Sequence, residues 1–235
     1  MPFGFFFFDP LYLLFALPAL LLAMFAQWKV QSAYRKFSQV RNAKNLTGEQ
    51  VAAYLLRANG LNLDVTGTPG NLTDHYDPRD KTLYLSAGVA RTPSVAAMGI
   101  VAHEVGHAVQ DAQGYAPMRV RAFLVTPATV GPWVGYLLFI AGIFINLSGL
   151  VWLGIAFFSA SLVFALATLP VEINASQRAL VMLRSSALVG PGEVDEAKSV
   201  LSAAALTYVA AAAQALSTLL YYVFVALNMS GRRRS

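Results

Sequence analysis

Residues 103–107 of this chain read His-Glu-Val-Gly-His and combine two imidazoles with one carboxylate. In a helix, side chains four positions apart lie on the same face, so His103 and His107 can bind one metal ion. Glu104, one position after the first histidine, can contact a metal-bound water without being a ligand itself. This spacing is typical of a zinc site that activates water for hydrolysis, as in zinc proteases.

The surrounding residues favour a metal site over an ordinary polar helix face with satisfied histidines. The chain has 3 histidines, and only one of them lies outside this motif. Burying three chargeable groups on the otherwise apolar stretch 95–109 would be costly without a metal or other partners. The small residues Ala102 and Gly106 also leave space beside the imidazoles.

A catalytic zinc usually has three protein ligands and one water, so the motif predicts a third ligand elsewhere. His75 is one candidate. Glu172 is the other, and it is the first charge after residues 122–171, which contain no Asp, Glu, Lys, Arg or His. Pro170 fits the start of a helix, which would place Glu172 in the first turn. The alternative is that Glu172 is an interfacial residue at the end of a membrane span.

The composition predicts an integral membrane protein. Of the 235 residues, 57% are hydrophobic and 12% are charged, against about 45–50% and about 25% in soluble domains. This amount of apolar sequence also excludes a disordered chain. The absence of cysteine excludes a disulfide scaffold, a thiol nucleophile and a cysteine-ligated metal.

The net charge of +5 suits a protein with basic residues at a membrane surface. We do not expect nucleic acid as a partner. Arg232–Arg234 supply three of these charges. A second basic group follows the first apolar segment, as juxtamembrane residues do; it comprises Lys29, Arg35, Lys36, Arg41 and Lys44.

A spanning helix needs about 20 mostly apolar residues. Four segments meet this requirement: 10–28, 123–145, 150–169 and 203–227. The first follows an aromatic group, Phe3 and Phe5–Phe8, and we expect Pro18 to kink it. A buried soluble helix is the alternative for the last.

The predicted organisation is a first span (1–28), a water-exposed domain (29–121), a transmembrane hairpin (122–169), a helical segment (170–202), and a fourth span with its basic tail (203–235).

Local signals predict the elements of the domain 29–121. Thr47 and Gln50 have the spacing of a capping box, which predicts a helix over 48–58. Gly67–Gly70 has the composition of a turn, and the segments 71–76 and 82–86 are expected to form a β-hairpin. Thr92 and Pro93 are expected to start the helix that carries the His-Glu-x-x-His motif, and Gly114 is expected to end it.

Several segments of the chain resemble one family. HEVGHAVQ (103–110), LTDHYDP (72–78), EINAS (172–176) and AAALTYVAAA (203–212) are similar to the neutral zinc metallopeptidases of the bacterial YugP type, and more distantly to HtpX-like membrane metallopeptidases. The resemblance covers nearly the whole chain. It implies His103, His107 and Glu172 as ligands of one Zn²⁺ per chain, with Glu104 as the catalytic base.

The same resemblance implies a mainly α membrane protein with about four transmembrane helices and a zincin-like α+β metallopeptidase domain of the gluzincin type, containing a short β-hairpin. One position departs from the pattern. HtpX-like enzymes often have an aspartate four residues after the ligand glutamate, whereas this chain has Ser176. A neutral hydroxyl orients a ligand histidine less strongly than a carboxylate does.

Topology provides an independent check, because His103 and Glu172 must lie on one side of the membrane to share an ion. The spans 123–145 and 150–169 form a hairpin that returns the chain to the side it left. The basic residues at 29–44 assign this side to the cytoplasm of the cell (inner) membrane. Four spans then place Arg232–Arg234 outside. Either the last segment does not cross completely, or the cytoplasmic charges outweigh the tail.

These observations predict hydrolysis of peptide bonds in protein or peptide substrates, membrane proteins among them. Glu104 would take a proton from water and deliver it to the leaving amine. An extended peptide could pair with the edge of the predicted hairpin. His75, Tyr76 and Arg178 are candidates for stabilising the oxyanion, although a structural role is open for each.

Two alternatives differ from this predicted protease in chemistry or in the location of the zinc. An intramembrane protease with its zinc inside the bilayer fits poorly, because only eleven uncharged residues separate Arg91 from His103. A non-catalytic zinc-binding adaptor or chaperone-like protein is the other, and the intact Glu104 argues against it.

Overall fold

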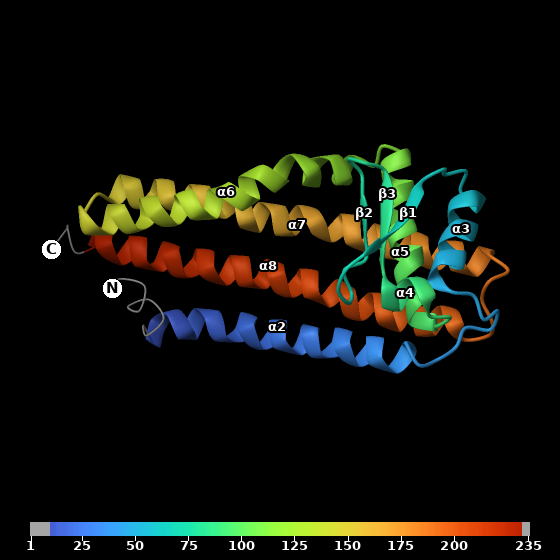
Figure 1. Cartoon of the computed structure of the whole chain (residues 1–235). Helices are drawn as coiled ribbons and strands as arrows, with labels where there is room; N and C mark the ends of the chain where they lie inside the picture. Colours follow the sequence, from blue (N-terminus) through green and yellow to red (C-terminus); the bar gives the residue numbers. More distant parts are fainter. Residues whose placement is uncertain (1–9, 232–235) are drawn as a thin grey trace. The chain divides into compact units, whose positions relative to one another are not determined.

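The computed structural model describes residues 10–231, which are mostly helical. The aromatic residues Phe3 and Phe5–Phe8 and the basic Arg232–Arg234 lie outside the described residues. Figure 1 shows the elements, which are α2 (Pro10–Phe37), α3 (Gly48–Ala58), β1 (Asp64–Thr68), β2 (His75–Asp77), β3 (Thr82–Ser86), α4 (Ala87–Arg91), α5 (Val95–Ala112), α6 (Ala116–Phe144), α7 (Ser148–Ser185) and α8 (Glu193–Gly231).

The described chain divides into two compact units. The helical unit comprises residues 10–26, 119–169 and 207–231. The mixed unit comprises residues 27–118 and 170–206 and contains the sheet. Four helices contribute residues to both units, namely α2, α6, α7 and α8.

The helical unit has the properties expected of a membrane-spanning bundle. Within the described residues, four helices are long and apolar enough to cross a membrane, namely α2, α6, α7 and α8. Large apolar side chains are exposed on them; Phe123 is 79% exposed and Trp133 is 72% exposed. Such a surface is stable against lipid and unfavourable against water. The structure thus contains the four long apolar helices that the sequence predicts as spans, and these helices extend beyond the predicted apolar segments.

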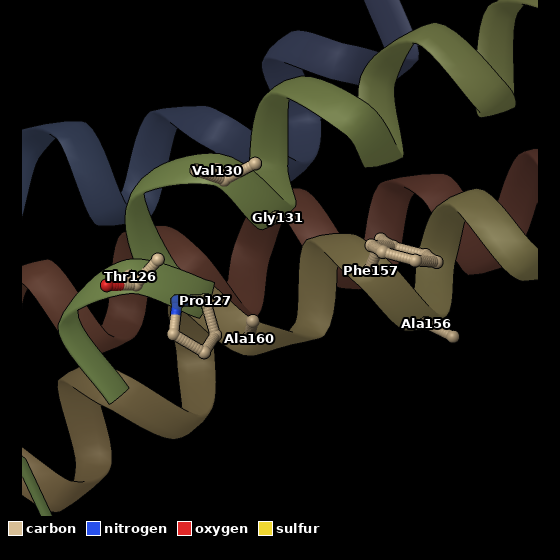
Figure 2. A pocket seen from close by; sticks show the side chains of 7 residues that line it. All are labelled: Thr126, Pro127, Val130, Gly131, Ala156, Phe157 and Ala160. Atoms are coloured by element: carbon tan, nitrogen blue, oxygen red, sulfur yellow. The ribbon is translucent and has the colours of Figure 1, made fainter. Parts of the chain in front are cut away.

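Glycines allow α6 and α7 to approach closely within the helical unit. A Cβ built on Gly135 would lie 2.6 Å from the carbonyl oxygen of Gly154, so neither helix can carry a larger residue there without moving. Further along the same pair is an apolar groove of about 520 Å³, shown in Figure 2. Thr126, Val130, Phe157 and Ala160 contribute to its lining. The lining has no titratable side chain, so the groove offers no group for hydrolysis.

Pro170 does not start a helix, contrary to the sequence-based prediction, but lies inside α7. Proline in a helix interior removes one hydrogen bond and costs about 3 kcal/mol. The residues after it offset this cost, because Val171, Ala175, Ala179 and Leu183 recur every four positions and are fully buried. Tertiary packing of this stripe therefore keeps the helix continuous.

The mixed unit is built around one hydrophobic core. Helix α3 begins with a capping box, in which the Thr47 side chain accepts a hydrogen bond from Gln50 N and the Gln50 side chain accepts one from Thr47 N. The predicted helix over 48–58 is confirmed. Its residues Val51 and Leu55 are buried in a cluster that also includes Val101 and Val105 of α5.

A three-stranded sheet with the order β1-β3-β2 lies beside α5 in the mixed unit (Figure 1). The antiparallel pair β2–β3 confirms the predicted hairpin, with Tyr76 opposite Leu83, but its first strand begins at His75 and not at residue 71. The parallel strand β1 was not predicted. Gly67, expected in a turn, lies inside β1 opposite Leu85. The turn prediction failed there because pairing with β3 keeps this glycine extended.

Helix α5 begins later than predicted. Its N-cap is Ser94, whose side chain accepts a hydrogen bond from Ala97 N, and not Thr92. The preceding residues are extended because they pair with the segment after α2: Asn42 N donates to Pro93 O, and Val95 N donates to Val40 O. A further short helix, α4, lies between the sheet and this segment. Gly114 follows the end of α5 with a φ of 62°, as expected for a helix stop.

Candidate metal centre

Helix α5 presents both motif histidines on one face while its other faces are packed in the core. Val101, Val105 and Ala108 are almost completely buried in that core. The side chains of His103 and His107 are 13% and 10% exposed. The motif therefore lies on a buried helix, and its histidines retain only slight contact with solvent.

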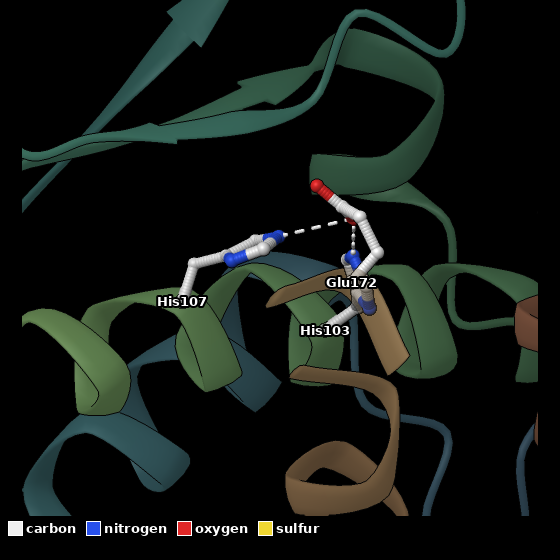
Figure 3. A group of neighbouring side chains, drawn as sticks. All are labelled: His103, His107 and Glu172. Carbon is white, nitrogen blue, oxygen red and sulfur yellow. Dashed lines mark hydrogen bonds and ion pairs between the residues drawn. The ribbon is translucent and has the colours of Figure 1, made fainter. Parts of the chain in front are cut away.

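Helix α7 brings Glu172 to these histidines, as Figure 3 shows. Glu172 Oε2 lies 3.2 Å from His103 Nε2 and 3.4 Å from His107 Nε2. Within the described residues, His103, His107 and Glu172 form a group that could hold a metal ion, because their ligand atoms all lie within 4.8 Å of one another. His75 is not part of this group.

The residue types and spacings suit zinc. For metal–ligand distances of 2.0–2.1 Å and tetrahedral angles, two ligand atoms should be about 3.3 Å apart. The two distances to the Glu172 carboxylate are close to this value. Two imidazoles and one carboxylate are also a known donor set for a catalytic zinc, in which water takes the fourth position.

Gly106 allows α7 to come close enough to deliver Glu172. A Cβ built on Gly106 would lie 2.7 Å from the carbonyl oxygen of Ala175 and 3.4 Å from its Cα. These are backbone atoms, which cannot move aside without shifting the helix. The small residue in the motif therefore permits contact between the two helices that carry the candidate ligands.

Neutral side chains contact the outward nitrogens of both histidines. His107 Nδ1 lies 3.0 Å from Gln110 Oε1, and His103 Nδ1 lies 3.1 Å from Ser176 Oγ. With Nδ1 occupied in this way, both imidazoles direct Nε2 toward Glu172. Ser176 therefore lies where a residue that orients His103 is needed.

Glu104 is buried beside the cluster and is held by the sheet. Its Oε2 accepts a hydrogen bond of 3.1 Å from Tyr76 N in strand β2. Burial raises the pKa of Glu104, and the neighbouring imidazoles oppose this effect only in part. Burial lowers the pKa of His107, but hydrogen bonding to Glu172 and the charge of Glu104 outweigh it, so the net direction is upward. The site thus attracts positive charge.

The three oxyanion candidates lie in different surroundings. His75 is exposed, stacks on Tyr84 with ring centroids 4.7 Å apart, and has Nδ1 2.8 Å from Thr73 O. The Tyr76 hydroxyl donates to Asp111 Oδ2, so only the backbone N–H of Tyr76 faces Glu104.

Arg178, the third candidate, donates from Nε to Asn174 Oδ1 at 2.7 Å and from one terminal nitrogen to Gln113 Oε1 at 2.7 Å. The Asn174 oxygen also accepts from Gln110 Nε2. Arg178 is thereby connected through two amide side chains to His107. The sequence motifs predicted no role for Gln110 or Asn174, although Gln110 lies one helical turn after His107, a spacing at which two side chains meet.

Comparison with known proteins agrees with this geometry. Residues 12–227 match the family described as "Putative neutral zinc metallopeptidase". The chain is 40% identical over 219 residues to the "Putative membrane protease YugP" of Bacillus subtilis (strain 168), which covers 93% of this chain and 97% of that relative. No solved structure matches the chain. A match over most of the chain, with a zinc-type donor set at its centre, shows that this protein belongs to the neutral zinc metallopeptidase family.

Proposed function

We propose that this protein is a membrane-bound zinc endopeptidase that hydrolyses peptide bonds with one Zn²⁺ per chain. His103, His107 and Glu172 would hold the metal, and Glu104 would act as the general base. The observation that carries this proposal is the convergence of the three donor atoms within 4.8 Å, next to a buried glutamate that is not one of them.

Zinc bound by these residues would supply a Lewis acid that polarises the scissile carbonyl and lowers the pKa of water. Glu104 has the properties of the proton carrier. Tyr76 N–H holds Oε2 in place, and the raised pKa makes the carboxylate a better proton acceptor than an exposed glutamate. The protonated form would then deliver the proton to the leaving amine.

Strand β2 is the proposed docking edge for an extended peptide. In the sheet formed by the described residues, β2 is an edge strand: one side pairs with β3, and no strand pairs with the opposite side. Tyr76 N–H points to Glu104, and in an extended strand the carbonyl of the same residue faces the same side. A peptide added here would run directly beside the proposed base. The substrates would therefore be proteins or peptides, membrane proteins among them, bound in extended form.

Of the three oxyanion candidates, Arg178 is the one we retain, because its guanidinium is always charged. Its connection through Asn174 and Gln110 ends on His107 Nδ1, the nitrogen that faces away from Glu172. Tyr76 is proposed to act through its backbone N–H on Glu104. His75 is proposed to support strand β2 through its stacking on Tyr84.

The active site is proposed to face the cytoplasm from the inner membrane. The support comes from the basic residues between Lys29 and Lys44, which follow the first span and mark the cytoplasmic side. The lipid bilayer is the remaining partner we propose, and nucleic acid is not one.

The decisive experiment is the exchange Glu104→Gln, which keeps the shape of the side chain but removes its basicity. We expect the purified variant to retain about one zinc per chain by elemental analysis while its cleavage of casein falls at least ~10²-fold. A wild-type protein that contains no zinc after metal-replete purification would contradict the proposed cofactor. Undiminished cleavage by the variant would refute the role of Glu104.

The second candidate function is a non-catalytic zinc-binding adaptor, which would keep the same donor set. It predicts that neither wild-type protein nor the Glu104→Gln variant cleaves any protein.

Comparing the membrane proteomes of cells that carry each form extends the test to natural substrates. Proteins that accumulate only with the variant would identify those substrates.

A further inference from the structure

We propose that Gln110 is a positioning residue that sets the tautomer of His107 and joins it to the helix that carries Glu172. The proposal rests on the proposed metal site. It concerns how two ligands on different helices are held in register before the metal binds.

Gln110 is fully buried, with an exposed fraction of 0%. Its Nε2 donates to Val171 O at 2.8 Å and to Asn174 Oδ1 at 3.0 Å, and its Oε1 lies 3.0 Å from His107 Nδ1. All polar atoms of this buried amide are hydrogen-bonded. Rotating it would leave a polar group unpaired, which costs free energy of folding.

This network determines where the oxygen and the NH₂ group of the Gln110 amide lie. Val171 O is a backbone carbonyl and can only accept, so the NH₂ group of Gln110 must face α7. The oxygen of Gln110 must then face His107, and His107 Nδ1 must carry the hydrogen. The lone pair of His107 is thereby left on Nε2, which is the atom 3.4 Å from Glu172.

The same side chain also fixes the position of Glu172. Val171 is the residue directly before Glu172, and Asn174 lies two positions after it, so the Gln110 amide holds α7 on both sides of the third candidate ligand. Asn174 is held in turn by Arg178 Nε at 2.7 Å. Gln110 therefore connects the orientation of one ligand to the placement of another.

The neutral amide also suits the local charge. Glu104 and Glu172 are both buried at this site, and a third carboxylate in contact with His107 would add to their mutual repulsion. An amide oxygen accepts the hydrogen of Nδ1 without adding charge. The role that a carboxylate often fills behind a zinc-bound histidine is thus filled here by a glutamine.

Two substitutions separate this role from simple packing. Gln110→Met keeps the length of the side chain but removes the acceptor for His107, and we expect zinc affinity to fall ~10–100-fold in competition with a chelator. Gln110→Glu keeps an acceptor for His107 but opposes the oxygens of Val171 and Asn174. Because the tautomer is kept and only the connection to α7 is lost, we expect a lower melting temperature and a loss of zinc affinity at least about threefold smaller than that of Gln110→Met.

The matched control is Gln39→Met, the same change at an exposed glutamine of the mixed unit, for which we expect unchanged zinc affinity. Equal losses of zinc affinity in Gln110→Met and Gln110→Glu would assign Gln110 a packing role only and overturn the inference, as would wild-type affinity in Gln110→Met. If Gln110→Met does not fold, Gln110→Glu decides alone: a lowered melting temperature with a loss of zinc affinity below ~10-fold supports the inference, and a larger loss overturns it. A wild-type protein that binds no zinc would instead refute the proposed metal site itself.

Discussion

Glu172 illustrates how much depends on a single side chain at this site. Its carboxylate contacts both imidazoles, and its side chain is only 3% exposed. A buried carboxylate is unfavourable unless a cation or hydrogen-bond donors compensate it. With the lone pair of His107 Nε2 facing this carboxylate, a divalent ion shared by all three side chains would provide the compensation. The position of Glu172 is therefore better explained by a ligand role than by the end of a membrane span.

Glu172→Ala is expected to lower zinc affinity by more than ~100-fold, because removing a ligand exceeds the ~10–100-fold loss typical of an outer residue. His75→Ala should keep the metal and at most slow turnover, because His75 stacks on Tyr84 outside the ligand group. Zinc titration of both purified variants measures the difference.

The control for Glu172→Ala is Glu193→Ala, since Glu193 is a buried carboxylate in the same unit that accepts from Ala43 N and Gly190 N. Its loss should lower stability and leave zinc affinity unchanged. An empty site in His75→Ala together with a filled one in Glu172→Ala would reverse the ligand assignment.

At the scale of elements, the site depends on how closely α5 and α7 approach. The two helices are in close contact at Gly106, where the backbone of Ala175 occupies the space of a side chain. Ala175 lies three residues after Glu172, so a displacement of α7 at this contact is transmitted directly to the carboxylate. The buried stripe from Val171 to Leu183 supplies the apolar contact that holds the helix there.

Gly106→Ala is therefore expected to separate the two helices. The added Cβ would be 2.7 Å from Ala175 O, and overpacking of this kind costs ~1–3 kcal/mol of folding stability. Zinc affinity should fall by at least about tenfold, as estimated for ligands whose support is lost. Thermal unfolding and chelator competition measure the two effects.

Gly67→Ala is the matched comparison for this substitution, because nothing lies within 4 Å of a Cβ built on Gly67. It should retain wild-type zinc affinity. Normal zinc binding and stability in Gly106→Ala would show that α7 can be displaced without affecting the ligands, contrary to the close packing proposed here.

For the whole molecule, the main constraint is that residues far apart in the chain share one compact unit. His103 precedes the spanning helices α6 and α7, whereas Glu172 follows the apolar part of α7, and both lie in the mixed unit. A transmembrane hairpin that returns the chain to its starting side satisfies this requirement. The proposed cytoplasmic location then depends on the basic residues 29–44.

A cysteine at position 45 tests this location, and the absence of native cysteines makes the label specific. Asn45 is exposed and lies just after the basic segment. In Asn45→Cys, an impermeant thiol reagent should leave intact cells unlabelled and label the protein only after the membrane is opened. Labelling in intact cells would place the mixed unit on the outer side.

Several features could be derived from the sequence because they depend on local geometry. Two histidines four positions apart share a helix face, and the Thr47–Gln50 capping box determines where α3 begins. The four apolar segments follow from composition, because only a lipid environment suits so much uncharged surface. Spacing alone leaves both Glu172 and His75 as candidates for the third ligand.

Other features were decided only by tertiary structure, since they arise between segments distant in the chain. Strand β1 forms by parallel pairing with β3, and α5 has its N-cap at Ser94 because residues 93–95 pair with residues 40–42. Pro170 stays inside α7 because the buried stripe after it outweighs the lost hydrogen bond. The folded chain likewise brings Glu172 and not His75 to the imidazoles, and it gives Gln110 its partners on α7. A local pattern specifies which groups are available, whereas long-range packing determines which of them meet.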